Sequence, residues 1–193
     1  MARHKEFNQQ EALSKAMETF WRYGYEGTSI QDLVESMGIN RGSLYDTFGD
    51  KRSLFLAAIA HYDETVVQNL VSRLEDPKAS KQAIIDYFYN LIERTVNDQS
   101  RRGCFLINTA VELCPHDLEA QQHIATNLQR IENAFYQALD RAMQKGEISQ
   151  NKDIRALARY LTCLMQGIRV FSKVNSNRDA LKDIVQTGLI ALD

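Results

Sequence analysis

Apolar residues recur along nearly the whole chain at the 3.6-residue period of an amphipathic α-helix. The alternation of apolar and polar residues that marks a half-buried strand is almost missing, and only two prolines and nine glycines interrupt the 193 residues. A chain of this length can bury a sizeable core without disulfides. The pattern predicts an all-α protein.

Glycine, proline and polar clusters separate the periodic stretches and set the expected helix ends. The first helix should begin after Asn8 and end at Gly24, and Thr28 should cap the second, which ends at Gly38. We expect about nine helices, over residues 9–23, 28–37, 41–48, 51–75, 80–97, 104–113, 117–145, 153–174 and 178–192.

Several functional classes are disfavoured by what the sequence lacks. The N-terminus has no hydrophobic leader and the three cysteines are an odd number, so we expect a cytoplasmic protein with reduced thiols. Charges interrupt every long apolar run, which argues against a membrane span. No zinc-ligand spacing, catalytic elbow or phosphate-binding glycine loop is present, so we expect no metal, no cofactor and no enzyme activity.

The charge balance does not favour a nucleic-acid partner. The formal net charge is −2, and residues 1–55 carry seven Lys and Arg against eight Asp and Glu. Any case for DNA binding must therefore rest on local geometry.

Residues 28–48 provide that geometry. Two short amphipathic helices joined by a turn at Gly38 are typical of a helix-turn-helix, whose second helix presents its outer side to the major groove. We expect that outer side to carry Asn40, Arg41, Gly42, Ser43, Tyr45, Asp46 and Thr47. A glycine inside a short helix costs roughly 1 kcal/mol relative to alanine, so Gly42 suggests the close approach of another backbone.

Both flanks of this segment could bind phosphate. A helix N-terminus at Thr28 offers N–H groups and a hydroxyl, and Lys51 and Arg52 are cationic. The basic arm formed by Arg3, His4 and Lys5 could reach an adjacent groove, or it could be a solvated chain end.

The stretch FWRYGYEGTSIQDLVESMGINRGSLYDTFGDKRSLF resembles the DNA-binding segment of the tetracycline-repressor (TetR) family of transcriptional regulators. The resemblance covers about residues 7–56. It implies a homodimer on a near-palindromic double-stranded operator, with a DNA-binding domain over residues 1–56 and a ligand-binding and dimerisation domain over residues 57–193.

The resemblance also assigns contacts to individual positions. It implies phosphate contacts at Thr28, Tyr45 and Lys51 and base or near-base contacts at Asn40, Arg41, Ser43 and Thr47. Asp46 and Thr47 depart from the commoner family pattern. Asp46 could accept from a cytosine amino group, pair with Lys51 or Arg52, or face away.

The C-terminal bundle gives less chemical information. Its candidate pocket residues are Phe88, Phe105, Asn108, Tyr136 and Met165. As a set they suggest a hydrophobic or aromatic small-molecule effector, although a residue of this kind taken singly is more often part of the core. The last two helices have wide apolar faces that either complete the core or pack on a twin, and Gly167 and Gly188 would allow close helix approach.

Cys104 follows Arg101, Arg102 and Gly103 at an expected helix N-terminus, where cations and the helix dipole lower a thiol pKa. It could be a reactive sensor, or an ordinary buried cysteine.

From the helix-turn-helix and the resemblance we hypothesise a transcriptional regulator, most simply a repressor released by its effector. The alternatives are a helical ligand-binding or interaction module that no longer reads DNA, and a regulator whose sensor is Cys104.

Overall fold

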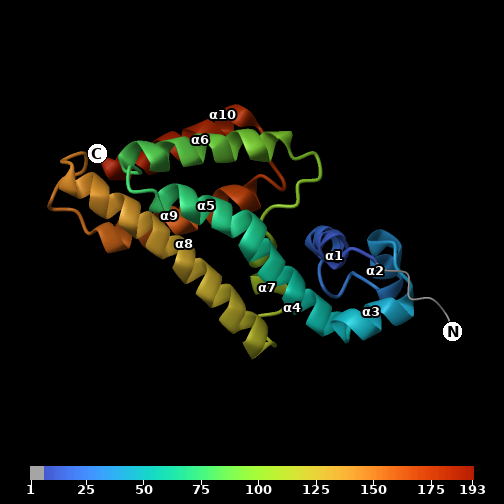
Figure 1. Ribbon diagram of the computed structural model, residues 1–193. Helices are drawn as coiled ribbons and strands as arrows, with labels where there is room; N and C mark the ends of the chain where they lie inside the picture. The colour runs from blue at the N-terminus through green and yellow to red at the C-terminus, as the bar shows by residue number, and fades with distance from the viewer. Residues whose placement is uncertain (1–6) are drawn as a thin grey trace. The chain divides into compact units, whose positions relative to one another are not determined.

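The computed structural model describes residues 7–193, and every regular element in that range is helical (Figure 1). The α-helices are α1 (Gln9–Tyr23), α2 (Ile30–Met37), α3 (Arg41–Phe48), α4 (Lys51–Tyr62), α5 (Gln68–Glu75), α6 (Lys81–Asn97), α7 (Phe105–Glu112), α8 (Leu118–Gln144), α9 (Ile154–Phe171) and α10 (Arg178–Leu189). The all-α prediction is confirmed. No described helix has both the length and the apolar composition that crossing a bilayer requires. The predicted basic arm, Arg3 to Lys5, lies outside the described residues.

The helix predicted over residues 51–75 contains a π-helical segment, η1 (Asp63–Val67), between α4 and α5. Counted as one continuous helix, α4, η1 and α5 bring the described helices to the predicted nine. Three successive β-branched residues, Thr65 to Val67, disfavour α-helical geometry there. In addition, the Thr65 hydroxyl donates to the His61 carbonyl at 2.7 Å, a contact that bends helices.

The chain divides into two compact units. The first contains the described residues up to Thr65 together with Phe105–Ile124, and the second contains Val66–Cys104 and Ala125–Asp193. The chain therefore passes between the units three times: within η1, just before α7, and within α8. The functional boundary at residue 56 stays a prediction.

An aromatic cluster fills the core of the first unit. Phe55 of α4 lies edge-to-face against Phe20 of α1, with ring centroids 4.9 Å apart, and against Phe105 of α7 at 5.6 Å. Tyr25 lies 5.0 Å from Phe55, and Tyr62 lies 5.6 Å from Phe105. Such pairs add stability beyond the area that they bury. The cluster joins α1, α4 and α7 into one core.

In the second unit, α6 and α10 lie side by side (Figure 1), and α10 also packs closely on α9. A Cβ at Gly188 of α10 would lie 2.5 Å from Leu164 Cδ2 and 3.0 Å from the Tyr160 hydroxyl, both on α9. This confirms that Gly188 permits close helix approach. A Cβ at Gly167 of α9 would instead meet no heavy atom of the described residues within 4 Å.

Candidate nucleic-acid interface

The second helix is capped by Ser29, so the prediction that Thr28 caps it is wrong. Ser29 Oγ accepts the Asp32 N–H at 3.1 Å, and Asp32 Oδ2 accepts the Ser29 N–H at 2.7 Å. This reciprocal capping box needs an acceptor three residues after the cap, and Asp32 stands at that distance from Ser29. The Ser29 hydroxyl also donates to Asp32 Oδ2 at 2.7 Å, and this bond together with the Ser29 N–H bond holds the pKa of the Asp32 carboxyl below its ordinary value.

Thr28 instead holds the turn between α1 and α2. Its hydroxyl donates to the Gly24 carbonyl at 2.6 Å, and the residue is only 1% exposed. The hydroxyl is therefore directed inward in this conformation. A phosphate contact by Thr28 stays a prediction.

The turn between α2 and α3 is short and locally determined. Gly38 adopts φ of +70°, a left-handed conformation that favours glycine, and its N–H donates to the Val34 carbonyl at 3.0 Å. Asn40 then caps α3, since its Oδ1 accepts the Ser43 N–H at 2.8 Å. The predicted helix-turn-helix is present, with Asn40 committed partly to the cap.

The outer side of α3 contains most of the predicted contact residues but not Ser43. Arg41 and Gly42 are exposed, Tyr45 is 43% exposed and Thr47 is half-buried. Ser43 is 6% exposed because it shares the inward side with Leu44, so its predicted position on the outer side is wrong.

Gly42 has one close neighbour within the chain. A Cβ there would meet only Asn40 Oδ1, the oxygen that caps α3, at 3.2 Å, among the described atoms within 4 Å. That separation is tighter than an ordinary Cβ contact, so the cap would have to shift by a few tenths of an ångström. On its other sides the backbone at Gly42 is open, and a second backbone could approach there.

The start of α4 forms the other flank. Asp50 caps the helix by accepting the Ser53 N–H at 2.7 Å, and the Lys51 ammonium lies 4.3 Å from the centre of the Tyr25 ring. Burial raises the pKa of the Tyr25 hydroxyl. The face of this neutral ring stabilises the Lys51 ammonium through a cation–π contact, and Lys51 is half-buried.

Arg52 is engaged within the first unit. Its guanidinium lies 2.9 Å from Asp117 and 2.6 Å from Glu119, at the start of α8. Asp117 also accepts the Ala120 N–H, and this bond together with Arg52 holds the Asp117 carboxyl pKa below its ordinary value. Sequence reasoning assigned Arg52 to phosphate and missed both acidic partners.

The candidate effector-pocket residues are divided between the two units. Phe105 belongs to the aromatic core of the first unit, and Asn108 is half-buried on α7. In the second unit Phe88 and Met165 are fully buried. The Phe88 ring stacks on Phe135 at 6.0 Å, so both units use predicted pocket residues in their packing.

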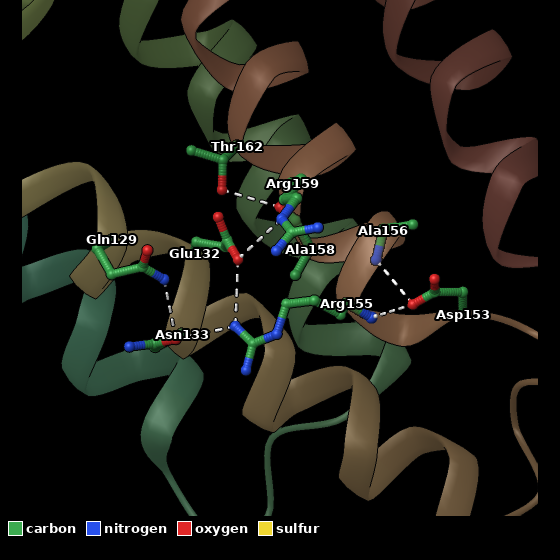
Figure 2. A network of polar contacts seen from close by, with 9 residues as sticks. All are labelled: Gln129, Glu132, Asn133, Asp153, Arg155, Ala156, Ala158, Arg159 and Thr162. Carbon is green, nitrogen blue, oxygen red and sulfur yellow. Dashed lines mark hydrogen bonds and ion pairs between the residues drawn. The ribbon is translucent and has the colours of Figure 1, made fainter. Parts of the chain in front are cut away.

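Tyr136 contacts Arg155, a member of the polar network between α8 and α9 that Figure 2 shows. The Arg155 guanidinium lies 3.9 Å from the centre of its ring, and Arg155 also bonds Glu132 at 3.2 Å and Asn133 at 2.9 Å. Figure 2 shows Arg159 reaching the same Glu132 carboxylate, at 3.5 Å. A ring covered by a guanidinium is a packing partner in this conformation, and a ligand contact by Tyr136 stays a prediction.

A surface hollow of about 480 Å³ lies between α1 and α2 in the first unit. It contains none of the predicted effector-pocket residues and is lined by Thr19, Tyr23, Gly27, Asp32, Glu35 and Ser36. Its two carboxylates would repel phosphate, so this side does not suit a nucleic-acid backbone.

Cys104 is 1% exposed and directly precedes α7. The cation beside its thiol is Arg169 of α9, whose guanidinium lies 3.3 Å from Sγ and also donates to the Tyr87 hydroxyl at 3.3 Å. Arg102, which the sequence suggested for this role, lies 3.7 Å from Asp98. Burial limits the access of reagents to this thiol.

Two family patterns match the chain. The pattern described as "Bacterial regulatory proteins, tetR family" matches residues 12–58, and "Tetracyclin repressor-like, C-terminal domain" matches residues 80–187.

Individual relatives match over nearly the whole length. The chain is 41% identical to the uncharacterized HTH-type transcriptional regulator YezE of Bacillus subtilis (strain 168), over 100% of both chains. It is 31% identical to the HTH-type transcriptional repressor ComR of Escherichia coli (strain K12), over 97% of this chain and 90% of ComR.

A cysteine mutant of the TetR family transcriptional regulator CifR, solved with 26bp double-strand operator DNA, superimposes with a TM-score of 0.88 at 26% identity. That match covers 99% of this chain and 100% of the CifR chain. The similarities therefore extend through the helix-turn-helix and the helical bundle.

Proposed function

The chain belongs to the tetR family of bacterial regulatory proteins, and from this premise we propose that it represses transcription as a cytoplasmic homodimer on a near-palindromic operator. It is a DNA-binding transcriptional regulator of the helix-turn-helix type, and such proteins are not enzymes. The observation that carries the proposal is the outer side of α3, where Arg41, Gly42 and Tyr45 are exposed on a tightly capped helix.

The proposed contacts follow from that surface. Arg41 is exposed in the first turn of α3, where a guanidinium can pair with a guanine edge in the major groove. Gly42 leaves room for a phosphate backbone. The Tyr45 hydroxyl and the Lys51 ammonium are the proposed contacts to phosphates on either side of Gly42. Asn40 and Thr47 are the remaining proposed contacts in the same groove.

Footprinting on the promoter beside the regulator's own gene tests these contacts. Arg41→Ala is expected to weaken operator binding by about 1–3 kcal/mol and to relax specificity at one base position. Tyr45→Ala and Lys51→Ala are each expected to weaken binding about tenfold across sequences, and Lys51→Ala to reduce the salt slope by about one.

Arg178→Ala is the matched control, because Arg178 pairs with Glu93 at 2.8 Å in the second unit and should leave binding unchanged. Specific protection that survives all three α3 and α4 substitutions would refute the proposed contacts. Binding that does not weaken as salt rises would instead favour a helical module that no longer reads DNA.

For the dimer, the outer side of α9 is the proposed surface. From Tyr160 onward the exposed residues of α9 recur at helical spacing and are mostly apolar. They are Tyr160, Cys163, Gly167, Val170, Phe171 and, just beyond the helix, Val174. Val174 is 81% exposed. The tight packing of α10 on α9 at Gly188 supports a rigid two-helix surface, and open space at Gly167 would admit the equivalent helix of a twin.

Release by a hydrophobic or aromatic effector requires that the effector bind the DNA-incompetent state more tightly. The buried aromatic and thioether side chains of the second unit, such as Phe88 and Met165, support an apolar ligand. Because the chain passes between the units three times, a rearrangement of the second unit would act on the first at three places.

A Cys104 sensor is a second candidate, favoured by the Arg169 guanidinium 3.3 Å from the thiol. Alkylation by N-ethylmaleimide should be slow, since the thiol reacts only when the structure opens locally. Once complete, it should lower operator affinity about tenfold, a shift within the usual range of coupling between sites.

Cys163→Ser accompanies this test, because Cys163 lies on the proposed dimer surface and its alkylation could otherwise be mistaken for an effect of Cys104. The protein lacking that thiol should still lose affinity when Cys104 is alkylated. Equal operator binding by treated wild type and treated Cys104→Ser would dispose of the sensor.

A further inference from the structure

Glu112, the last residue of α7, binds the turn between α1 and α2. Glu112 Oε2 accepts the Tyr25 N–H at 3.0 Å, and Oε1 accepts the Glu26 N–H at 2.8 Å. These N–H groups directly follow Gly24, the residue that ends α1. A charged acceptor forms stronger hydrogen bonds than a neutral one, and here it binds two adjacent backbone donors.

The fit around this carboxylate is close. A Cβ at Gly24 would lie 2.8 Å from Glu112 Oε2 and 2.9 Å from Oε1, and Gly24 adopts φ of +78°. Glycine is therefore needed at position 24 both for its backbone conformation and for the approach of the carboxylate. On the other side of the turn, the Thr28 hydroxyl bonds the Gly24 carbonyl.

The same part of the chain also holds the far flank of the helix-turn-helix. Residues 105–124, which we call the bracket, include Glu112 at one contact and Asp117 and Glu119, the partners of Arg52, at the other. The first contact fixes the approach to α2, and the second fixes the start of α4. The bracket lies in the first unit but is joined to the second unit at both of its ends.

We infer that Glu112 is a positioning residue for operator recognition, which rests on the DNA-binding role proposed above. It touches no DNA itself. By holding the turn that leads into α2, it fixes the orientation of α2 and α3, so that less conformational freedom is lost when the operator binds.

The sign of the expected effect separates this role from simple electrostatics. Glu112 is an anion in the DNA-binding unit, so removing its charge should by itself strengthen binding to a polyanion. A positioning role gives the opposite result, because the freed turn must be ordered again on DNA.

The experiment measures operator affinity of the full-length protein with Glu112→Ala, Glu112→Gln and the control Val111→Ala, whose side chain on the same helix is exposed. We expect Glu112→Ala to bind about tenfold more weakly and Glu112→Gln, which keeps one acceptor oxygen, to bind with intermediate affinity. Val111→Ala should match wild type. Amide hydrogen exchange at Tyr25 and Glu26 should accelerate in Glu112→Ala and be partly restored in Glu112→Gln.

Each other outcome is decisive. Faster exchange at Tyr25 and Glu26 with equal or tighter operator binding would overturn the positioning role, and so would unchanged exchange. If Glu112→Ala does not fold, Glu112→Gln gives the same readouts. A wild-type protein with no specific operator would overturn the proposed function, a failure distinguishable from the first because it involves no variant.

Discussion

Replacing Phe55 with alanine is expected to lower the free energy of unfolding of the first unit by about 3–5 kcal/mol. Phe55 is 1% exposed, and its ring contacts Phe20, Tyr25 and Phe105 from three different parts of the chain. The truncation would leave a cavity at the centre of that cluster. Urea denaturation followed by Trp21 fluorescence measures the change, because Trp21 is the single tryptophan and lies 5.1 Å from Tyr62 in the same core.

Tyr23→Ala is the matched control. Tyr23 lies at the end of α1 in the same unit, but it is 57% exposed, so its truncation should change stability by less than about 1 kcal/mol. Equal destabilisation by the two substitutions would mean that the aromatic cluster is not the core of this unit.

Replacing Gly167 with arginine is expected to separate the dimer and to weaken operator binding by about 10²- to 10⁴-fold. In the monomer the site is open to a Cβ, which would meet no described heavy atom within 4 Å, and arginine is a better helix former than glycine. In an isologous dimer each substitution appears twice at the contact and buries two like charges. The separated monomer then binds a single half-site of the operator, whereas the dimer binds two linked half-sites.

Sedimentation velocity and a mobility-shift titration on the same samples measure both effects. Gln137→Arg adds the same charge at an exposed position of α8 and should leave the protein dimeric. A Gly167→Arg protein that stays dimeric and binds its operator normally would remove the outer side of α9 from the interface.

The helix ends could be predicted from sequence because local groups determine them. Asn8 caps α1, and Gly24 and Gly38 end helices, each within four residues of its partners. The cap of α3 by Asn40 was not predicted, although its partner Ser43 lies three positions on. The local sequence alone did not separate Thr28 from Ser29 as the cap, since Gln31 and Asp32 each stand three positions after one of them. Ser43 was misplaced because a small polar residue fits either side of a two-turn helix.

The remaining features depend on contacts between distant segments. Glu112 accepts hydrogen bonds from Tyr25 and Glu26, which lie more than eighty positions away in the sequence. Neither this spacing nor the residue types predict such a pairing. Phe105 and Tyr136 have aromatic rings that would suit a ligand, yet one ring packs on Phe55 and the other lies beneath Arg155. Composition alone cannot distinguish an aromatic ring that contacts protein from one that contacts a ligand.

The discontinuous first unit limits how this regulator can be recombined with others. A hybrid that takes residues 1–56 from this chain and its remaining helices from elsewhere would carry Phe55 without Phe105, Gly24 without Glu112, and Arg52 without Asp117. Reprogramming a sensor by exchanging N-terminal segments should therefore succeed only when residues 105–124 are transplanted along with them. A donor protein becomes interchangeable with this one to the extent that it supplies the same three partners.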